Sequence, residues 1–465
     1  MSKRLMCVLL CVVMCVSVLS AGCGSQNTPA EPDTTAAQNS ATEVESTPAE
    51  ATSAPAKPVK IRFANSWPEA STFGKVFHPE LNKFMSDHKD TIEIVSESVS
   101  GDELNTKVKV EAASGQLSDV FGYWGNWSNI QHIVDPGLLL DIDEYVKLSS
   151  EKDLRARYSD AVWSLFSYKD GKTYGIPLVG FTSLTLCNKE LFKKYNLEYP
   201  KTYDDLLAVS KVFNENGIIP LAQSSKGGNP GHFFISSLIA QYPTGIDTLT
   251  KIKPDWSIDY PDVLNALKLI KDMKDKGVLP KDTISNGDWG PHAALYDQGK
   301  AAMIYTQSWM ISAISPELAE NSEIIPFPQI PGGRDDYDQL MYEGANFGAV
   351  INKKSFEDTT KTQAIVDFMD FLSSDDFQRI LVGIGEPAAK MGVNFDTIKV
   401  PPLLSRVLED NSKKKVIHLG LYESYPASEP YFTFAFSFDE LFSGAITPEQ
   451  CLKKGQDALD AGKEN

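Results

Sequence analysis

Aromatic side chains with polar neighbours are the residues of this sequence that could do chemistry together. They follow candidate strands or lie in loop-like stretches, and the set is Trp67, Tyr123, Trp124, Asn126, Trp289, Gln307 and Trp309. A flat indole or phenol face matches the C–H face of a sugar ring, while amides and carboxylates beside it can bind the ring hydroxyls. The pattern therefore favours recognition of a hydroxylated ring compound.

Motifs of the common catalytic and cofactor sites are absent from the sequence. It holds no H-E-x-x-H, no G-x-S-x-G and no C-x-x-C, and its six histidines are scattered singly at 78, 88, 132, 232, 292 and 418. Residues 383–388 read G-I-G-E-P-A, but this match to a dinucleotide-binding turn follows a helical pattern rather than a strand. We therefore expect no catalytic residue, no metal site and no cofactor.

The net charge excludes one class of partner. Forty-four Lys and Arg against 62 Asp and Glu give a formal charge of −18, which repels phosphate backbones. A chain of 465 residues that is 42% hydrophobic can bury a large core. Its length suggests about two to four domains. We thus expect a globular protein that binds no nucleic acid.

The first 22 residues resemble a lipoprotein signal peptide. Lys3 and Arg4 precede an apolar run from residue 5 to residue 19, which is too short to span a hydrocarbon core of about 30 Å. The string L-S-A-G-C at 19–23 resembles a bacterial lipobox, in which the cysteine carries diacylglycerol. We expect cleavage before Cys23 and a lipid anchor on that thiol, at the outer face of the cytoplasmic membrane. Ordinary cleavage near an incidental cysteine is the alternative.

A tether and a body follow the signal. Residues 23–57 are rich in Thr, Ala, Ser, Pro and Glu and cannot form a core, so we expect a disordered tether there. The body begins near Pro58 and holds two cysteines, Cys187 and Cys451. Because Cys187 lies in an apolar, strand-like run, we expect free thiols rather than a bridge.

Short β-branched runs alternate with helical patterns along the body. Residues 60–63, 92–95, 119–121, 302–305 and 348–351 have the pattern of strands. Thr202, with Asp205 three residues later, marks a helix start, and the apolar stripe behind it ends at Gly217. The order predicts an α/β fold, in which ligands bind at the carboxyl ends of strands.

Several short motifs in order along the body carry a family resemblance. They are A-A-S-G at 112–115, S-D-V-F at 118–121, D-G-K-T-Y-G-I-P at 170–177, N-K-E-L-F at 188–192, P-K-T-Y-D-D-L at 200–206, G-K-A-A-M at 299–303, P-F-P at 326–328 and P-G-G at 331–333. With Trp309, they resemble the bacterial extracellular solute-binding proteins of family 1, the maltose-binding-like receptors of sugar ABC transporters. Ser118, Cys187 and Gln307 depart from the family's usual Pro, Tyr and Gly. The resemblance covers about residues 59–395.

This resemblance implies an α/β fold of the two-lobed, type II periplasmic-binding-protein kind, with hinge-connected discontinuous lobes and a ligand cleft between them. With crossings near 177–181 and 343–346, lobe 1 would hold 58–178 and about 345–385, and lobe 2 about 179–344 and 386–465. A ligand that touches both lobes stabilises the closed form. The implied function is a monomeric extracellular receptor that binds a carbohydrate, of two or more rings, and delivers it to the permease of an ABC importer without altering it.

The resemblance also suggests which side chains meet the ligand. Trp309 is the candidate platform with Gln307 beside it, and Glu343 and Asn346 would reach hydroxyls from the second crossing. His232 lies where the family often has a ligand-facing aromatic residue. The full predicted set is Trp67, Tyr123, Trp124, Asn126, Phe181, His232, Trp289, Gln307, Trp309, Glu343, Asn346 and Glu386.

Two other interpretations stay open at this point. A surface lipoprotein that hydrolyses glycosides would have a similar aromatic cleft, but it needs two carboxylates about 5–10 Å apart across it. A receptor for a solute other than a sugar, such as a polyamine or a peptide, is the second. Release of product separates the enzyme from the receptor. The sequence does not reveal which sugar is bound, its length or its linkage.

Overall fold

The computed structural model describes residues 57–463 apart from 72, 100, 126, 286–288, 412, 418 and 419. The predicted signal peptide, the anchor residue Cys23, nearly all of the predicted tether and the candidate Asn126 lie outside the described residues. Pro55–Asn465 clusters as a unit of its own. None of the helices described there is long and apolar enough to cross a bilayer.

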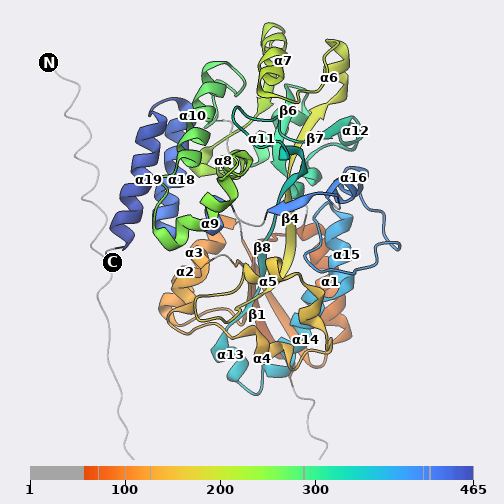
Figure 1. Ribbon diagram of the computed structural model, residues 1–465. Helices are drawn as coiled ribbons and strands as arrows, with labels where there is room; N and C mark the ends of the chain where they lie inside the picture. Colours follow the sequence, from red (N-terminus) through yellow and green to blue (C-terminus); the bar gives the residue numbers. More distant parts are fainter. Residues whose placement is uncertain are drawn as a thin grey trace, which may run out of the picture. The chain divides into compact units, whose positions relative to one another are not determined.

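A mixed sheet runs through this body (Figure 1). Its strands, in spatial order, are β2 (Ile92–Ser98), β1 (Val59–Asn65), β3 (Val120–Trp124), β8 (Leu340–Ile351), β4 (Ile176–Asn188), β6 (Ala301–Gln307) and β5 (Ile219–Ala222), with β7 (Ser322–Ile325) beside β4 and β9 (Lys415–Ile417) beside β8. β1 is parallel to β2 and β3, and β5 is parallel to β6. The five strands predicted from the sequence are confirmed, although β3 begins one residue later than expected and continues to Trp124.

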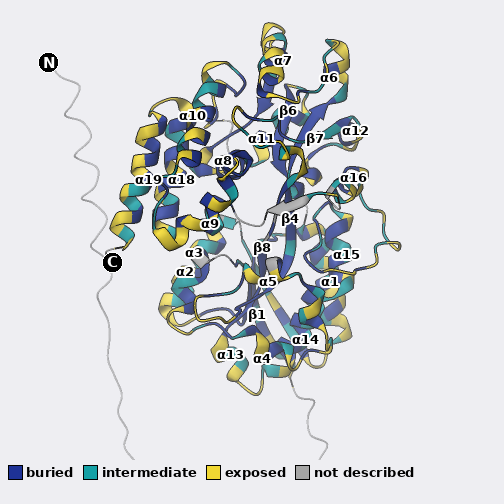
Figure 2. Ribbon diagram, in the orientation of Figure 1, coloured by how far each residue is buried: buried dark blue, intermediate teal, exposed yellow. Residues whose placement is uncertain are grey.

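Buried apolar residues form separate cores along the sheet. Figure 2 colours the ribbon by burial, with buried residues in dark blue. The first core draws on residues 61–178 and 347–389, and the second on 181–342 and 421–459. A smaller cluster beside the second core includes Leu184, Ile304 and Leu403. The chain passes from one core to the other within β4, between Leu178 and Phe181, and within β8, between Tyr342 and Phe347.

Helices cover both parts of the sheet. Those with residues in or against the first core are α1 (Gly74–Asp87), α2 (Gly101–Ser114), α3 (Trp127–Val134), α4 (Ile142–Val146), α5 (Asp160–Ser164), α13 (Lys353–Glu357), α14 (Thr362–Ser373) and α15 (Asp375–Gly383). Those of the other part are α6 (Lys189–Lys194), α7 (Tyr203–Glu215), α8 (Gly231–Gln241), α9 (Gly245–Asp255), α10 (Pro261–Asp275), α11 (Trp289–Asp297), α12 (Pro316–Glu320), α16 (Pro402–Asn411), α17 (Leu421–Ser424), α18 (Ser428–Ser443) and α19 (Pro448–Lys463). The short 3₁₀ turns are η1 (Leu154–Arg157), η2 (Lys226–Gly228), η3 (Ser308–Ala313) and η4 (Tyr337–Gln339).

The start of α7 shows the predicted local signal in detail. The Asp205 amide donates to Thr202 Oγ1 at 3.2 Å, and the Thr202 amide donates to Asp205 Oδ2 at 3.0 Å. This reciprocal pair satisfies two amides that the first helical turn leaves free. The stripe of α7 is buried, and the chain turns away at Gly217, whose φ of +71° suits glycine.

The paired strands β4 and β8 are irregular where the chain passes between the cores. They are antiparallel, with Ile176 opposite Ala349 and Phe181 opposite Gly344, and the register shifts twice between Pro177 and Phe181. A Cβ at Gly344 would lie 2.7 Å from the Phe181 ring, so the close approach of these strands requires glycine there. Such irregular pairing is where an antiparallel ladder bends most readily.

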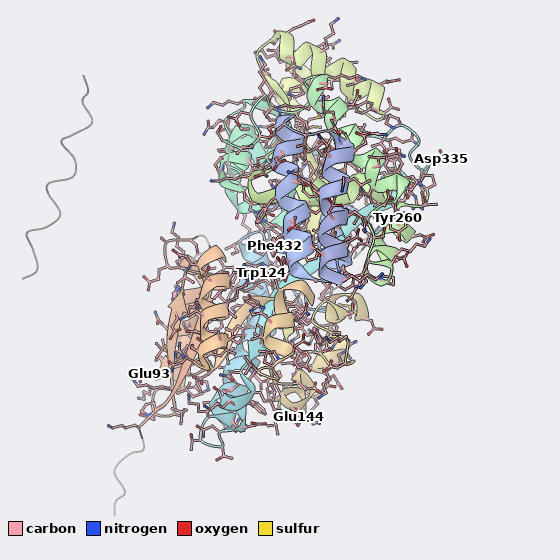
Figure 3. The ribbon with its side chains drawn as sticks, turned by 90° about the vertical axis from the view of Figure 1, so that its left-hand side faces the viewer. Glu93, Trp124, Glu144, Tyr260, Asp335 and Phe432 are labelled. Carbon is pink, nitrogen blue, oxygen red and sulfur yellow. The ribbon has the colours of Figure 1, made fainter. Side chains whose placement is uncertain are left out.

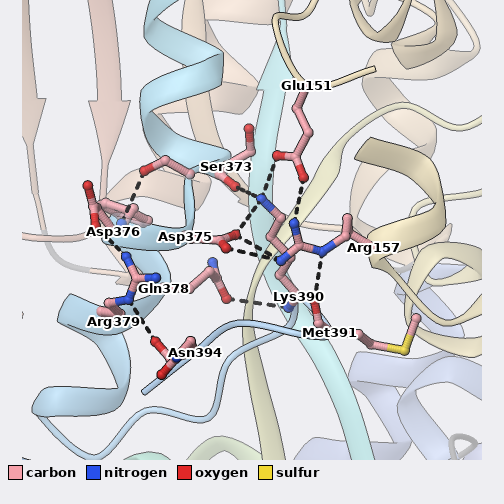
Figure 4. Close-up of polar contacts among 12 residues, drawn as sticks. Glu151, Arg157, Ser373, Asp375, Asp376, Gln378, Arg379, Lys390, Met391 and Asn394 are labelled. Atoms are coloured by element: carbon pink, nitrogen blue, oxygen red, sulfur yellow. Dashed lines mark hydrogen bonds and ion pairs between the residues drawn. The ribbon is translucent and has the colours of Figure 1, made fainter. Parts of the chain in front are cut away.

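A buried ion cluster holds a third segment, around residue 390, against the first core (Figure 4). Lys390 is 1% exposed, and its Nζ donates to Glu151 Oε2 at 2.6 Å, Asp375 Oδ1 at 2.9 Å and the Ser373 carbonyl at 2.9 Å. Arg157 bonds the same two carboxylates, at 2.8 Å and 3.0 Å. Each charge in the cluster therefore has a partner of opposite sign, which is what a buried ion needs.

Gln378 ties this segment to β4. Its side chain is fully buried. Gln378 Nε2 donates to the Leu178 carbonyl at 3.0 Å, and its Oε1 accepts from the Ala389 amide at 3.0 Å. One amide thus fixes two chain segments beside the first core.

Both cysteines of the body are free and buried, as the sequence predicted. Burial raises the pKa of the Cys187 thiol well above its ordinary value. Ser437 and Cys451 are hydrogen-bond partners at 3.1 Å, and burial raises the pKa of the Cys451 thiol to about 12. Both are structural, unreactive thiols.

Candidate functional site

Five aromatic side chains meet in the second core and form the aromatic box of this structure. They come from five different elements: Phe181 from β4, Phe233 from α8, Trp289 from α11, Trp309 from η3 and Tyr342 from β8. Neighbouring ring centroids are 5.1–5.9 Å apart, and most pairs are edge-to-face. Each such pair contributes about 0.5–1.5 kcal/mol beyond its buried area.

Two indoles form the partly exposed side of the box. Phe181, Phe233 and Tyr342 are buried, at 1%, 4% and 6% exposure, whereas Trp289 and Trp309 are half-buried. The two indoles are 5.1 Å apart and inclined at 72°, so they make a corner of flat apolar faces backed by buried rings. A corner of this kind suits the C–H face and edge of a sugar ring.

The end of β6 positions Trp309. β6 ends at Gln307 and turns directly into η3, and Ser308 Oγ accepts a hydrogen bond from the Thr182 amide of β4 at 3.1 Å. Ser312 Oγ donates to the Trp309 carbonyl at 3.0 Å, which closes the turn. Since β5 and β6 are parallel, Trp309 lies at the carboxyl end of this pair, where the sequence placed a ligand site.

Two predicted contact residues of this region point into the protein. Gln307 is fully buried, and its Oε1 accepts from Ser183 Oγ at 2.8 Å. His232 is 5% exposed, with its Nε2 3.0 Å from Asn229 Oδ1 and its ring 4.0 Å from that of Phe233. Burial lowers the pKa of His232 to about 3, so it is neutral at physiological pH. We leave both residues out of the site proposed below.

The predicted residues of the first core differ in their exposure. Trp67 is 5% exposed and packs against Phe73 at 4.3 Å, Phe77 at 4.9 Å and Phe347 at 5.4 Å, as a core residue does. Tyr123 is fully buried, and its hydroxyl has no hydrogen-bond partner among the residues that the structure describes; burial raises its pKa above the ordinary range. Trp124 is half-buried and contacts Phe347 at 5.3 Å. Of the three, Trp124 alone offers part of its ring to solvent.

Glu343 and Asn346 have their backbones in β8, between Tyr342 of the aromatic box and Phe347 of the first core. Glu343 is opposite Thr182 of β4 in the register. Their side chains lie outside what the structure describes, so their contact with a ligand stays a prediction.

Glu386 lies in the loop that follows α15. Gly385 has φ +100°, and a Cβ there would come within 3.5 Å of Ile311 and Ser312, in the same turn as Trp309. The Glu386 side chain is partly exposed, but Oε2 is covered and none of the described residues bonds to it. Burial raises the pKa of Glu386 to about 8.

An exposed aromatic strip on α17 and α18 was not predicted from the sequence. Phe436 is 56% exposed, Phe432 and Tyr422 are half-buried, and the Phe432 and Phe436 rings stack at 6.0 Å. α18 contacts α3, which directly follows the loop after Trp124. Phe432 and Trp124 are both labelled in Figure 3. The available signal was the four-residue spacing of Phe432 and Phe436, on the opposite side of the helix from the core residues Phe434 and Phe438.

A cavity of about 640 Å³, including space open to solvent, lies behind the box. Tyr342, Tyr305, Ser183 and Ser237 are among its lining residues. Ser237 and Tyr305 bond to each other and Ser183 bonds to Gln307, so these hydroxyls are already satisfied. We therefore favour the corner of Trp289 and Trp309 over this cavity as the binding surface. Within the described part of the chain, no group of His, Cys, Asp and Glu could hold a metal ion.

The sequence matches one protein-family model. Residues 64–379 match the model described as bacterial extracellular solute-binding protein. The fructooligosaccharide ABC transporter substrate-binding protein FusA of Streptococcus pneumoniae is 25% identical over 260 residues, which cover 49% of this chain and 46% of that protein. The galactooligosaccharide-binding protein of Bacillus subtilis is 26% identical over 238 residues, covering 49% and 51%. The chain thus spans about half the length of these curated relatives.

Solved structures resemble the body over most of its length. A chitin oligosaccharide binding protein superposes with a TM-score of 0.74 at 20% identity, covering 86% of this chain and 98% of that one. The maltose/maltodextrin-binding domain MalE from Bdellovibrio bacteriovorus, bound to maltotriose, gives a TM-score of 0.66 at 16% identity, covering 88% and 100%. At this identity the likeness shows the fold, which is the two-lobed, type II α/β fold that the sequence predicted.

Proposed function

Because the chain belongs to the bacterial extracellular solute-binding protein family, we propose that it is a receptor that binds a carbohydrate and delivers it to an ABC importer. The observation that carries the proposal is the corner of Trp289 and Trp309, held at the end of β6 by three buried aromatic residues. The sugar-binding names of the relatives FusA and galactooligosaccharide-binding protein support the same ligand class.

In this proposal one sugar ring stacks on Trp309 and its edge meets Trp289. Trp124 and the strip of Phe432 and Phe436 would extend the surface to further rings, which favours an oligosaccharide over a monosaccharide. Rigid rings lose little conformational entropy on binding, so they are efficient contacts. Glu343 and Asn346, as predicted, would bind hydroxyls from β8.

Delivery requires that the receptor change when it is loaded. We propose that the parts of the body around the first core, residues 61–178 and 347–389, and around the second, residues 181–342 and 421–459, are lobes that rotate about the irregular part of β4 and β8. A ligand touching both lobes favours the closed form by the difference of its affinities for the two forms. The permease can then distinguish loaded from empty receptors. The receptor itself alters no bond of the ligand.

The experiment is a titration of the body, residues 58–465, with mono-, di- and oligosaccharides by calorimetry and tryptophan fluorescence. Trp309→Ala should weaken binding of the preferred sugar by about 30–100-fold, because the buried centre of an interface carries most of its energy. Trp256→Phe is the matched control, since Trp256 packs at the end of α9 next to Gly462 and Gln456. Equal affinity in wild type and Trp309→Ala contradicts the proposal, and so does turnover of the sugar to shorter products.

The anchor forms part of the same proposal. We propose that diacylglycerol on Cys23 holds the receptor at the outer face of the membrane, with residues 23–57 as its tether. The full-length Cys23→Ser variant, expressed in a bacterium with lipoprotein processing, should appear in the medium or periplasm rather than in the membrane fraction. Membrane retention of that variant would rule the anchor out. Gel filtration of the body should give a monomer.

A further inference from the structure

Glu386 is a partly exposed acid, and one of its carboxyl oxygens is covered. Its Oε2 is covered, and no described residue bonds to that atom. The contacts of its loop on η3, β4 and α15 involve Ile311, Ser312, Gly180 and Leu381, none of which carries a charge. Covering a carboxylate without a partner destabilises a fold. Such a group is therefore expected where function, rather than stability, requires it.

The loop places Glu386 beside the aromatic box. Gly385 packs on Ile311 and Ser312, two and three residues after Trp309. On its other side, the Pro387 carbonyl accepts from the Gly180 amide at 3.0 Å, one residue before Phe181. Both neighbours of Glu386 thus contact segments that carry a ring of the box.

The surroundings favour a cation as the missing partner. An indole face attracts an ammonium group through the ring quadrupole, and the partly exposed rings of the box, Trp289 and Trp309, are both indoles. The formal charge of −18 adds a long-range attraction for cations and disfavours anionic sugars. A flat ring with an ammonium substituent would satisfy the stacking surface and the carboxylate together.

We propose that the ligand is an amino sugar, whose ring stacks on Trp309 while its ammonium group is held by the Glu386 carboxylate. This inference rests on the proposed function as a carbohydrate receptor and makes its ligand class more specific. A polyamine has the charge but no ring to stack, and a neutral sugar has the ring but no cation to stabilise the ionised carboxylate.

The proposal predicts a measurable exchange of protons with the buffer when the ligand binds. In the empty receptor the Glu386 carboxyl has a pKa of about 8 and is mostly protonated at neutral pH. An ammonium group favours the ionised form, so a ligand that arrives as the ammonium ion displaces the carboxyl proton to the buffer, whereas one that arrives as the free amine takes that proton up itself. Binding at pH 7 therefore releases fewer than one proton per ligand. A neutral sugar has no such effect, and its binding is independent of the ionisation enthalpy of the buffer.

The test uses the body in calorimetric titrations with a glucosamine trimer, its N-acetylated counterpart, maltotriose and spermidine, each at pH 7 in two buffers. Wild type should bind the glucosamine trimer about 10–100-fold more tightly than the acetylated trimer, as a charge-assisted hydrogen bond provides. Glu386→Gln should abolish this preference and the proton release, and leave maltotriose binding within about threefold. Glu320→Gln is the control, because it removes an exposed carboxylate of α12.

The outcomes separate this inference from the function on which it rests. Trp309-dependent binding of maltotriose or the acetylated trimer, with no preference for the glucosamine trimer, overturns the amino-sugar proposal and leaves the carbohydrate receptor standing. An unchanged preference in Glu386→Gln overturns it too. Binding of spermidine without binding of any sugar contradicts both.

Discussion

Lys390 and Glu386, two ionisable groups four residues apart, have opposite surroundings. Lys390 donates to two carboxylates and one carbonyl within 2.9 Å, and Arg157 completes the cluster. Glu386 has no described partner on Oε2. Both lie in the segment that follows α15 and contacts β4. The difference teaches that a fully paired buried charge holds a fold together, whereas an unpaired one points to a ligand.

The largest effect should come from removing the paired charge. Lys390→Met leaves Glu151 and Asp375 with Arg157 as their remaining cation, and we expect a loss of about 3–5 kcal/mol in the free energy of unfolding. Urea denaturation measures it. Lys453→Met, which removes an exposed lysine paired with Asp457, should change stability by less than about 1 kcal/mol. Similar losses of unfolding free energy in the two variants would contradict the claim that the buried, paired charge of Lys390 holds the fold together.

A smaller loss of stability should follow when the uncharged Gln378 side chain, which bonds to two backbone groups, is replaced. Gln378→Leu leaves the Leu178 carbonyl and the Ala389 amide without their buried partner, at an expected cost of about 2 kcal/mol in unfolding free energy. The control is Gln363→Leu on the exposed face of α14. If both variants unfold at the same urea concentration, the hydrogen bonds of Gln378 do not hold the segment around residue 390 in place.

Removing the unpaired charge should stabilise the empty receptor, and increasingly so as pH rises. The folded-state pKa of Glu386, about 8, exceeds its ordinary value of 4.5, so the native state binds the extra proton between these values. The free energy of unfolding of the wild type therefore falls as pH rises through that window, and Glu386→Gln escapes the fall. Since part of the side chain reaches solvent, we expect a gain of about 1–2 kcal/mol at pH 9 and almost none at pH 4. A constant difference between the two proteins across this range contradicts the assignment.

The smallest effect should come from shifting the Glu386 loop without touching the acid. A Cβ at Gly180 would lie 3.3 Å from the Ala388 carbonyl oxygen and 3.4 Å from that of Pro387. Gly180→Ala should displace the loop by a few tenths of an ångström and weaken binding of the glucosamine trimer about fivefold, or roughly 1 kcal/mol. Maltotriose affinity is the internal reference. A matching loss for maltotriose would show that the change disturbs Trp309 rather than the loop.

Local sequence patterns predicted the helices and strands well because the interactions that begin and end them involve residues close together in the chain. The reciprocal bonds of Thr202 and Asp205 and the positive φ of Gly217 depend on a few neighbouring residues. The family motifs supplied the fold, since they occur in order along one chain. The aromatic corner was predicted in part for the same reason: Trp309 follows a strand, and parallel strands end on one side.

Contacts between residues far apart in the chain determine which of the predicted site residues are buried, and the sequence does not show these contacts. Trp67 also follows a strand, yet Phe347, from nearly 300 residues later, helps to enclose it in the first core. Gln307 is the last residue of β6, two positions before Trp309, and its side chain bonds to Ser183 of the neighbouring strand β4. The strip of Phe432 and Phe436 was missed because a four-residue aromatic spacing in a helix is as typical of a core as of an exposed face.

The central claim is that the corner of Trp289 and Trp309, with Glu386 beside it, binds the ligand. A crystal structure of the body soaked with the glucosamine trimer tests it most directly. We predict one sugar ring stacked on Trp309 with its ammonium nitrogen within hydrogen-bond distance of a Glu386 oxygen. A trimer seated in the cavity behind the box, with Trp309 untouched, would contradict the account.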